Sequence, residues 1–116
     1  MPTKPIYWLF GIRLSPELPP EKEKEFVDWF NQVHIPAALE SIPGLTGLAL
    51  YETLNPEEGY PKYLCNLEFE NEQALEAVAR SPAWAASAEQ RRRDGWGEDE
   101  VGFAMTWGVK HKPTAL

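Results

Sequence analysis

One histidine in this chain combines an ionisable ring with a position that is expected to be buried. His34 belongs to segment 29–36, WFNQVHIP, where it shares the apolar face of an expected helix and precedes Pro36 by two residues. Histidine titrates near neutral pH, so an imidazole in an apolar cleft is a candidate general acid or base. The alternative is a core histidine whose ring nitrogens bond to nearby carbonyl groups. Residue type and spacing leave both interpretations open.

Three polar side chains on expected strands are candidates to act with His34. Tyr51, Asn66 and Glu68 are expected to line a substrate site, with Tyr51 or Asn66 binding an oxygen on which negative charge develops. Asn66 and Glu68 are two residues apart and therefore point to one face of their strand. A polar Asn66 inside a sheet needs a partner or a wet cavity. A structural hydrogen bond is the competing interpretation for Asn66.

Aromatic residues are abundant for so short a chain. The five tryptophans could line a site for a flat aromatic molecule. Trp8, Phe30 and Trp107 are the candidates for substrate contact, although packing explains Trp8 and Trp107 equally well. The sequence has no phosphate loop or nucleophile elbow, and two histidines with one cysteine form no known metal-binding pattern. We therefore expect no metal and no organic cofactor.

The elements that would position these residues follow the order β-α-β-β-α-β. Runs of β-branched and aromatic residues predict strands at 6–14, 45–54, 62–70 and 101–109. Pro20 can begin the first helix, and Asn71 and Ser81 can cap helix starts in the second half. The turn-rich segment 55–61 predicts a hairpin between the second and third strands. The fold class is α+β: a ferredoxin-like, four-stranded antiparallel sheet with the helices on one face.

Pro36 interrupts the pattern of the first helix. Its ring lacks an N–H and crowds the carbonyl of Gln32, and Ile35 is expected to turn toward extended geometry. The helix should therefore kink or restart at Pro36. Projection at about 100° per residue predicts one set of core-facing side chains: Phe26, Phe30, Val33, His34 and Ala37.

The sheet face away from the helices is not uniformly polar in this chain. In the last strand, small residues alternate with larger apolar ones: Phe103, Met105, Trp107 and Val109. An apolar face of that size needs a cover, and a second copy of the chain is the expected one. Loops or tails that fold over the face are the alternative. The expected protein partner is thus the chain itself, in a homodimer.

Length, composition and charge restrict the class of protein. The 116 residues fit a single domain, 1–116, with a core at about 5–110 and short tails. No apolar run approaches the roughly 20 residues that span a bilayer, and residues 1–10 lack the pattern of a secretory signal. The single cysteine, Cys65, cannot form an intrachain disulfide, so a cytoplasmic location is expected. The net charge of −7 argues against nucleic acid as a partner, and the basic run 91–93 is interpreted as cations at a helix C-terminus rather than an anion site.

Taken together, these motifs resemble the dimeric α+β barrel proteins, and within them the EthD-like branch. The likeness runs through most of the chain. Segment 29–36 resembles the family's aromatic-x-x-x-His-x-Pro helix end, and the Pro-Gly pair in 42–52 resembles the entry to its second strand. Weaker similarities lie in YLCNLEFEN at 63–71 and SPAW at 81–84.

The resemblance implies two sheets that meet across a dimer axis and one cleft per subunit between helices and sheet. Relatives with known activity isomerise lactones, cyclise or dehydrate polyketides, or oxidise anthrones, generally without metal or organic cofactor. The catalytic histidine that some relatives carry at the helix end corresponds to His34. A second pocket histidine of some members has no clear counterpart, because His111 lies in the tail.

Three functions are compatible with these expectations. The leading hypothesis is a cofactor-independent enzyme, of isomerase, cyclase or dehydratase type, in which His34 moves a proton on a small aromatic, lactone or polyketide-like substrate. The second is a non-catalytic dimer that binds a small ligand or is purely structural. The third is cofactor-free oxygenation of an electron-rich phenol, of the anthrone monooxygenase type.

Overall fold

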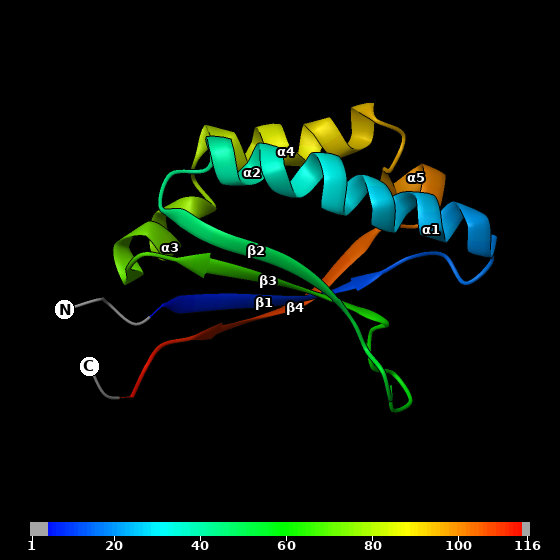
Figure 1. The fold of residues 1–116 in the computed structure, drawn as a ribbon, viewed down its shortest axis with the longest axis horizontal. Coiled ribbons are helices and arrows are strands. Elements are labelled where there is room, and N and C mark those ends of the chain that lie inside the picture. The colour runs from blue at the N-terminus through cyan, green and yellow to red at the C-terminus, as the bar shows by residue number, and fades with distance from the viewer. Residues whose placement is uncertain (1–4, 115–116) are drawn as a thin grey trace.

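Over residues 5–114 the chain folds into a layer of helices on one face of a four-stranded sheet (Figure 1). The structure, a computed structural model, describes these residues except for the side chain of Trp107. The strands are β1 (Ile6–Arg13), β2 (Leu45–Glu52), β3 (Tyr63–Phe69) and β4 (Ala104–His111). The helical elements are α1 (Pro20–Trp29), the π-helical turn η1 (Phe30–His34), α2 (Ile35–Ser41), α3 (Glu72–Val78), α4 (Pro82–Arg93) and α5 (Glu98–Val101).

The sheet has the ferredoxin-like strand order. Within the described residues the strands lie in the order β2-β3-β1-β4, and each neighbouring pair is antiparallel. Figure 1 shows α1, α2, α4 and α5 above one face of the sheet, with α3 near one end. The predicted α+β fold class, with its antiparallel sheet and its helices on one face, is confirmed.

Local sequence signals set where the helices begin. Pro20 is the first residue of α1. The side chain of Asn71 accepts a hydrogen bond from the N–H of Ala74, and that of Ser81 accepts one from Ala83. Such caps satisfy N–H groups that have no helical partner in the first turn. The helix starts predicted from these residues are confirmed.

The first helix runs through Pro36 in helical geometry, contrary to the predicted kink or restart. Ile35 has φ −60° and ψ −51°, so the expectation of extended geometry there is wrong. The chain accommodates the proline through η1, in which the N–H of Ile35 bonds to the carbonyl of Phe30, five residues earlier. A π turn widens the helix at the point where a proline ring would crowd an α-helical carbonyl.

The π turn also changes which side chains face the sheet. One extra residue in the turn keeps positions spaced by four, namely Phe30, His34 and Ala38, on one side of the helix. Ala38 is buried, whereas Val33 is 42% exposed. The predicted face is therefore corrected at Val33, while Phe26 and Phe30 are buried as expected.

Alternation along β3 separates the two faces of the sheet. Tyr63, Cys65, Leu67 and Phe69 are buried under the helices, and the residues between them are half-buried on the other side. Pairing extends this division to the neighbouring strands, because residues directly opposite in an antiparallel pair share a face. We call the side without helices the open face. Its members include Tyr7, Leu9, Ala49, Tyr51, Leu64, Asn66, Glu68 and Val109.

β4 begins later than predicted. Val101 lies in α5 rather than in a strand. Gly102 ends that helix with φ 67°, a left-handed conformation that glycine adopts without steric cost. An added Cβ on Gly102 would also lie 2.8 Å from the backbone nitrogen of Ser15. The helix therefore stops here, and the strand starts two residues further on.

An irregularity in β4 divides residues that were predicted to share a face. Pairing of β4 with β1 shifts register between Phe10 and Gly11. A bulge of this kind changes the facing of the residues beyond it, so Met105 lies on the helix side and Val109 on the open face. The prediction of one apolar face that contains both residues is wrong. The side chain of Trp107, assigned to the same face, lies outside the described part of the structure.

The core fills the space between the helices and the sheet. Phe26 is fully buried, and its ring meets that of Trp96 edge-on with centroids 5.7 Å apart. At the other end of the sheet, Gly44 has φ 77°, and a Cβ there would lie 2.4 Å from the Cβ of Ala74. Glycine at this position therefore lets α3 pack directly against the turn that enters β2.

Candidate functional site

A cavity of about 100 Å³ lies between the helix layer and the sheet. Most of its lining is apolar: Phe10, Ile12, Phe30, Ala38, Ile42, Leu48, Leu67, Trp84, Ala88, Phe103 and Met105. The other lining residues carry polar or ionisable groups: His34, Cys65, Ser87 and Arg91. A concave, largely apolar space with a few polar groups is typical of a small-molecule site.

His34 reaches this cavity from the end of η1. Its ring centroid lies 4.9 Å from that of Trp29 and 4.9 Å from that of Phe30. Nε2 is 3.5 Å from the hydroxyl oxygen of Ser87, at the outer limit of a hydrogen bond. Nδ1 is buried and has no hydrogen-bond partner among the described residues. Neither ring nitrogen therefore has a short hydrogen bond to another described side chain.

Burial keeps the imidazole of His34 uncharged. Removal from water lowers the pKa of His34 below its ordinary value of 6.5, and the positive charge of Arg91 lowers it further. A hydrogen-bonding contribution from Gln90 and the negative charge of Asp94 act in the opposite direction. Because the net shift is downward, the ring at pH 7 is neutral, with a donor on one nitrogen and a lone pair on the other.

α4 supplies a wall of the cavity that was not assigned to the site from sequence. Trp84, Ser87 and Arg91 all line the cavity. Their spacing of three and four residues places them on one face of the helix. Arg91 is only 6% exposed, so the interpretation of run 91–93 as simple helix-end cations is incomplete. The spacing of these three residues was visible in the sequence, but the burial of Arg91 depends on tertiary contacts that the spacing does not show.

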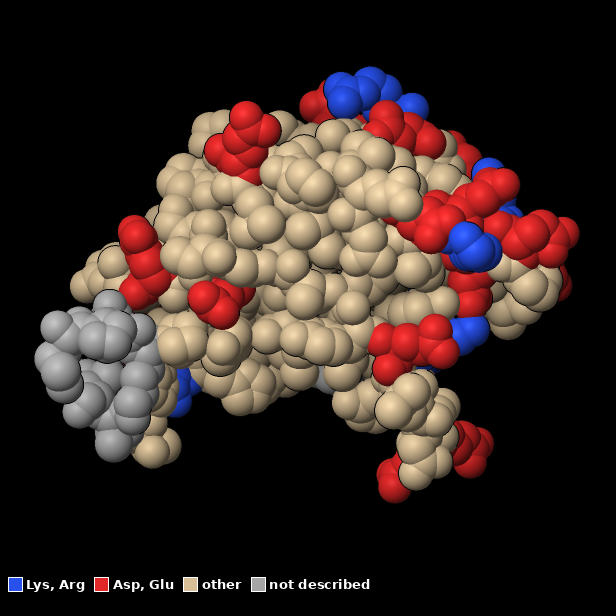
Figure 2. All heavy atoms as spheres, viewed as in Figure 1, with Lys and Arg blue, Asp and Glu red and all other residues tan. Residues whose placement is uncertain are grey.

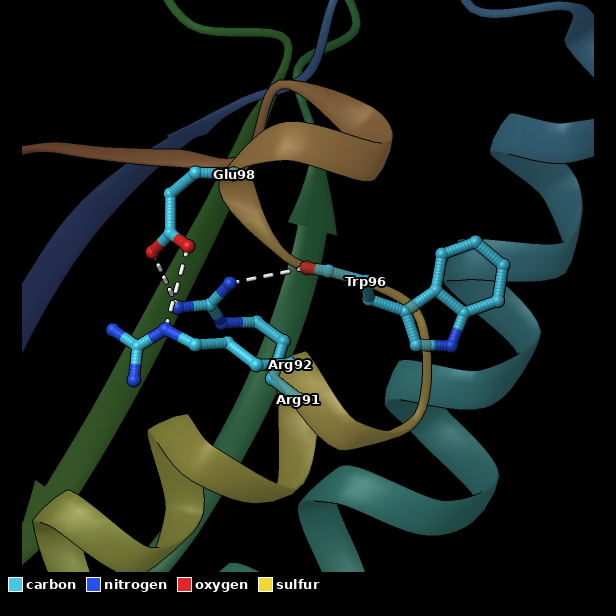
Figure 3. Close-up of polar contacts among 4 residues, drawn as sticks. All are labelled: Arg91, Arg92, Trp96 and Glu98. Carbon is cyan, nitrogen blue, oxygen red and sulfur yellow. Dashed lines mark hydrogen bonds and ion pairs between the residues drawn. The ribbon is translucent and has the colours of Figure 1, made fainter.

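The segment that follows α4 holds Arg91 in place (Figure 3). Its Nη1 donates to the carbonyl of Trp96 and its Nη2 to a carboxylate oxygen of Glu98, both at 3.0 Å. The other carboxylate oxygen of Glu98 accepts from Nε of Arg92 at 3.3 Å. The pKa of Glu98 is lowered to about 2 by a hydrogen bond from its own backbone N–H and by hydrogen bonds from Arg91 and Arg92. Glu98 therefore remains a carboxylate anchor across the neutral pH range.

Two of the expected substrate-binding residues lie at or beside the cavity. Phe30 lines it directly. Trp8 stacks on Trp84, with ring centroids 5.6 Å apart and 15° between the planes. Since Trp84 lines the cavity and Trp8 does not, Trp8 supports the wall from behind.

The structure does not bring Tyr51, Asn66 and Glu68 together with His34. All three lie on the open face, whereas the cavity lies on the helix side of the sheet. Tyr51 is 53% exposed, and Glu68 accepts a hydrogen bond from the hydroxyl of Thr46 at 3.0 Å. The expectation that they converge on His34 is corrected, because the sheet separates them from it within one subunit. The side chain of Trp107, the remaining candidate, is outside the described residues.

A cysteine nucleophile and a metal site are two other features to which the described residues can be compared. Burial raises the pKa of the Cys65 thiol to about 12, so its nucleophilic thiolate form is scarce at neutral pH. Within these residues, no cluster of three or more His, Cys, Asp or Glu side chains is arranged to hold a metal ion. No helix in the same range has the length and apolar character needed to cross a membrane.

Comparison with solved structures identifies proteins of the same architecture. An EthD family protein from Bacillus halodurans superposes with a TM-score of 0.55, at 16% identity over 90% of this chain and 99% of that one. HapK from Hahella chejuensis gives a TM-score of 0.65, at 13% identity over 96% and 94% of the two chains. A dimeric protein of unknown function with a ferredoxin-like fold, from Bacteroides fragilis, gives 0.63, at 18% identity over 95% and 98%. The chain shares the ferredoxin-like fold of these proteins.

The similarity to these proteins is one of fold rather than of sequence. No family model and no curated protein sequence matches the chain. The fold neighbours include an EthD family protein and dimeric ferredoxin-like proteins, as the resemblance to the dimeric α+β barrel proteins implied. At identities of 13% to 18% the likeness establishes the fold, and the chemistry has to be argued from the residues of this cavity.

Proposed function

We propose that this chain is a cofactor-independent enzyme that moves a proton on a small aromatic, lactone or polyketide-like molecule bound in the cavity between helices and sheet. One observation carries the proposal: His34 is an uncharged, half-buried base that lines a mostly apolar cavity, with its Nε2 beside the hydroxyl of Ser87. Isomerases, cyclases and dehydratases of this kind share one elementary step, the transfer of a proton to or from a carbon beside a carbonyl.

The proton transfer uses both nitrogens of the His34 ring. With the proton on the buried Nδ1, Nε2 carries the lone pair that accepts the substrate proton, beside the Ser87 hydroxyl that lines the cavity. The electrons of the broken C–H bond move to the carbonyl oxygen of the substrate, which becomes an enolate, and His34 becomes an imidazolium. The Trp29 ring, 26° from parallel with His34, stabilises that cation through its π face. The imidazolium then returns the proton to another atom of the same molecule, so the enzyme ends unchanged.

A direct test follows hydrogen exchange on a simple carbon acid. Phenylacetone in D₂O loses its α-proton signals in ¹H NMR as deuterium replaces them. The wild-type protein should accelerate this exchange, and His34→Gln should reduce the acceleration by on the order of 100-fold. His111→Gln is the matched control, since His111 lies at the end of β4, rather than in the tail as predicted, and outside the cavity lining. Equal acceleration by wild type and His34→Gln would contradict the proposed role of His34.

We further propose that the working form is a homodimer joined through the open face. Apolar side chains such as Leu9, Leu64 and Val109 lie there without helices above them. A face of this kind is stabilised when a second copy covers it. The similar protein from Bacteroides fragilis is dimeric, which supports a dimeric assembly here. Asn66 and Tyr51 would then contact the partner subunit rather than the substrate.

Non-catalytic binding of a small ligand is the second candidate. It is favoured by the largely apolar lining of the cavity, which would hold an aromatic molecule without any chemistry. The exchange experiment separates the two functions when it is combined with a binding measurement. Binding of phenylacetone without acceleration of its exchange in wild type would favour this second candidate.

Cofactor-free oxygenation of a phenol is the third candidate. The rings of Trp29 and Trp84 lie close to His34 and the cavity, where they could hold an electron-rich aromatic substrate. Oxygen consumption in the presence of anthrone tests it, with His34→Gln and heat-denatured protein as controls. Consumption by the wild-type protein above both controls would favour oxygenation.

A further inference from the structure

The cavity contains a second functional group, the guanidinium of Arg91. Arg91 is only 6% exposed and lines the same space as His34. Burial of a permanent charge is costly unless other groups compensate for it. In this chain the compensation comes from a carbonyl, a carboxylate and an aromatic face.

Those contacts use only part of the hydrogen-bonding capacity of Arg91. A guanidinium has five N–H donors in one plane. One donor bonds to the carbonyl of Trp96 and one to Glu98, both at 3.0 Å. The Cζ atom of Arg91 lies 3.9 Å from the centre of the Phe103 ring, which covers a face of the guanidinium rather than a donor. Three donors therefore remain beyond these bonds in a side chain that borders the cavity.

The charge balance around Arg91 differs between the cavity and the outside. Acidic side chains gather around the ends of α1 and α5 on the surface (Figure 2). Glu98 belongs to this outer layer, since its side chain is 52% exposed, and it divides its two oxygens between Arg91 and Arg92. No carboxylate from the described residues lines the cavity, where the ionisable neighbours of Arg91 are a neutral imidazole and a protonated thiol. Among the described residues, the guanidinium of Arg91 is therefore the one permanent charge in the cavity lining, and its partner Glu98 lies outside that lining.

We infer that Arg91 forms an anion subsite in the cavity, so that the ligand is a small aromatic molecule that carries an anionic oxygen next to the group on which His34 acts. This inference rests on the proposed function, because it takes the cavity to be the ligand site. The guanidinium of Arg91 also supplies a hydrogen-bond donor for a developing enolate oxygen. Tyr51 and Asn66 cannot fill this role from the open face. The aromatic body of the ligand packs against Phe30 and Trp84, and its anionic oxygen accepts from the free donors of Arg91.

Benzoate and benzamide form a matched pair of probes, since they have nearly the same shape and differ in charge at pH 7. Binding of each is measured by calorimetry and by ¹⁵N NMR of the full chain. Wild type should bind benzoate on the order of tenfold more tightly than benzamide. Arg91→Met should remove this preference, and Arg91→Lys should keep part of it.

Arg93→Met is the control variant. Arg93 belongs to the same basic run, but its side chain is 70% exposed and pairs only loosely with Asp94, at 3.9 Å. Its loss should leave the preference for benzoate unchanged. If Arg91→Met proves unfolded by circular dichroism, the comparison in wild type and in Arg91→Lys decides the question alone.

The outcomes separate this inference from the proposed function. Equal binding of benzoate and benzamide by wild type would overturn the anion subsite and leave the proton-transfer site standing. Binding of neither probe, together with no exchange of phenylacetone, would overturn both. A benzoate preference that survives in Arg91→Met would also overturn the inference, because the anion would then be bound by another group.

Discussion

The imidazole of His34 lies nearly parallel to the indole of Trp29, with centroids 4.9 Å apart and 26° between the ring planes. Trp29 is fixed in turn, because its Nε1 donates to a carboxylate oxygen of Asp94 at 2.9 Å. Asp94 is the residue that ends α4. The hydrogen bond therefore ties the end of α1 to the end of α4 and supports the surface on which the imidazole rests.

A double-mutant cycle should detect this link. Trp29→Phe keeps an aromatic ring against His34 but removes the donor, and Asp94→Ala removes the acceptor. Each change should lower the free energy of unfolding by about 1 kcal/mol, and the two losses should not add, because both break the same bond. Urea unfolding measures all four variants. Asp99→Ala, in α5, is the control, and its free energy of unfolding should lie within about 0.5 kcal/mol of that of wild type. Fully additive losses for the Trp29 and Asp94 variants would show that the hydrogen bond contributes nothing to stability.

Pro36 should determine the direction of the His34 ring through the π turn. Alanine at position 36 restores an N–H that can bond to the carbonyl of Gln32, as in an ordinary α-helix. If the π turn then becomes an ordinary α-helical turn, His34 rotates relative to Phe30. In Pro36→Ala, the ring-current shifts that Trp29 induces on the protons of His34 should therefore decrease. Pro43→Ala, just beyond α2, should leave them unchanged; unchanged shifts in Pro36→Ala itself would mean that the proline does not set the turn.

The open face should lose its partner when it gains a charge. Leu9 lies in β1 opposite Asn66 and Val109, in the middle of that face. Leu9→Glu should convert the dimer to monomer in sedimentation equilibrium at about 10 μM, because two carboxylates would be buried against an apolar partner surface. Leu39→Glu makes the same substitution on α2, where the side chain is 39% exposed, and should leave the dimer intact. A wild-type chain that sediments as a monomer at this concentration would refute the proposed assembly.

The low pKa of His34 should make stability depend on pH. In the unfolded chain a histidine takes up its proton near pH 6.5, whereas in the folded chain the pKa of His34 lies lower. Below pH 6.5 the unfolded state therefore binds more protons, and acid favours unfolding by up to about 1.4 kcal/mol per pH unit until the folded-state pKa is passed. His34→Gln lacks this contribution. The stability difference between wild type and His34→Gln should shrink from pH 7.5 to pH 5, and a constant difference would rule out a depressed pKa.

Short-range signals were sufficient to predict most of the fold. The helix starts at Pro20, Asn71 and Ser81 depend on caps and ring geometry that act within a few residues, so sequence alone identified them. The hairpin of β2 and β3 followed from the turn-rich segment between them. Features that depend on tertiary packing were not accessible in this way, notably the π turn before Pro36 and the register shift in β4.

The candidate site was predictable only in part. His34 and Phe30 were identified because a histidine on an apolar helical face is conspicuous, and both line the cavity. Asn66 was placed on the wrong side, although its alternation with the buried Cys65 and Leu67 already indicated the face opposite the helices. Arg91 was missed because charged residues near a helix end are usually solvated, and only tertiary contacts show that this one is buried.

The central claim is that a neutral His34 meets the ligand inside the cavity. It is tested most directly by ¹⁵N NMR of the imidazole nitrogens at pH 7, before and after addition of phenylacetone. The account predicts an uncharged ring whose nitrogen resonances shift as phenylacetone saturates the site, while those of His111 stay constant. A His34 ring that is protonated at pH 7, or that does not respond to saturating phenylacetone, would contradict it.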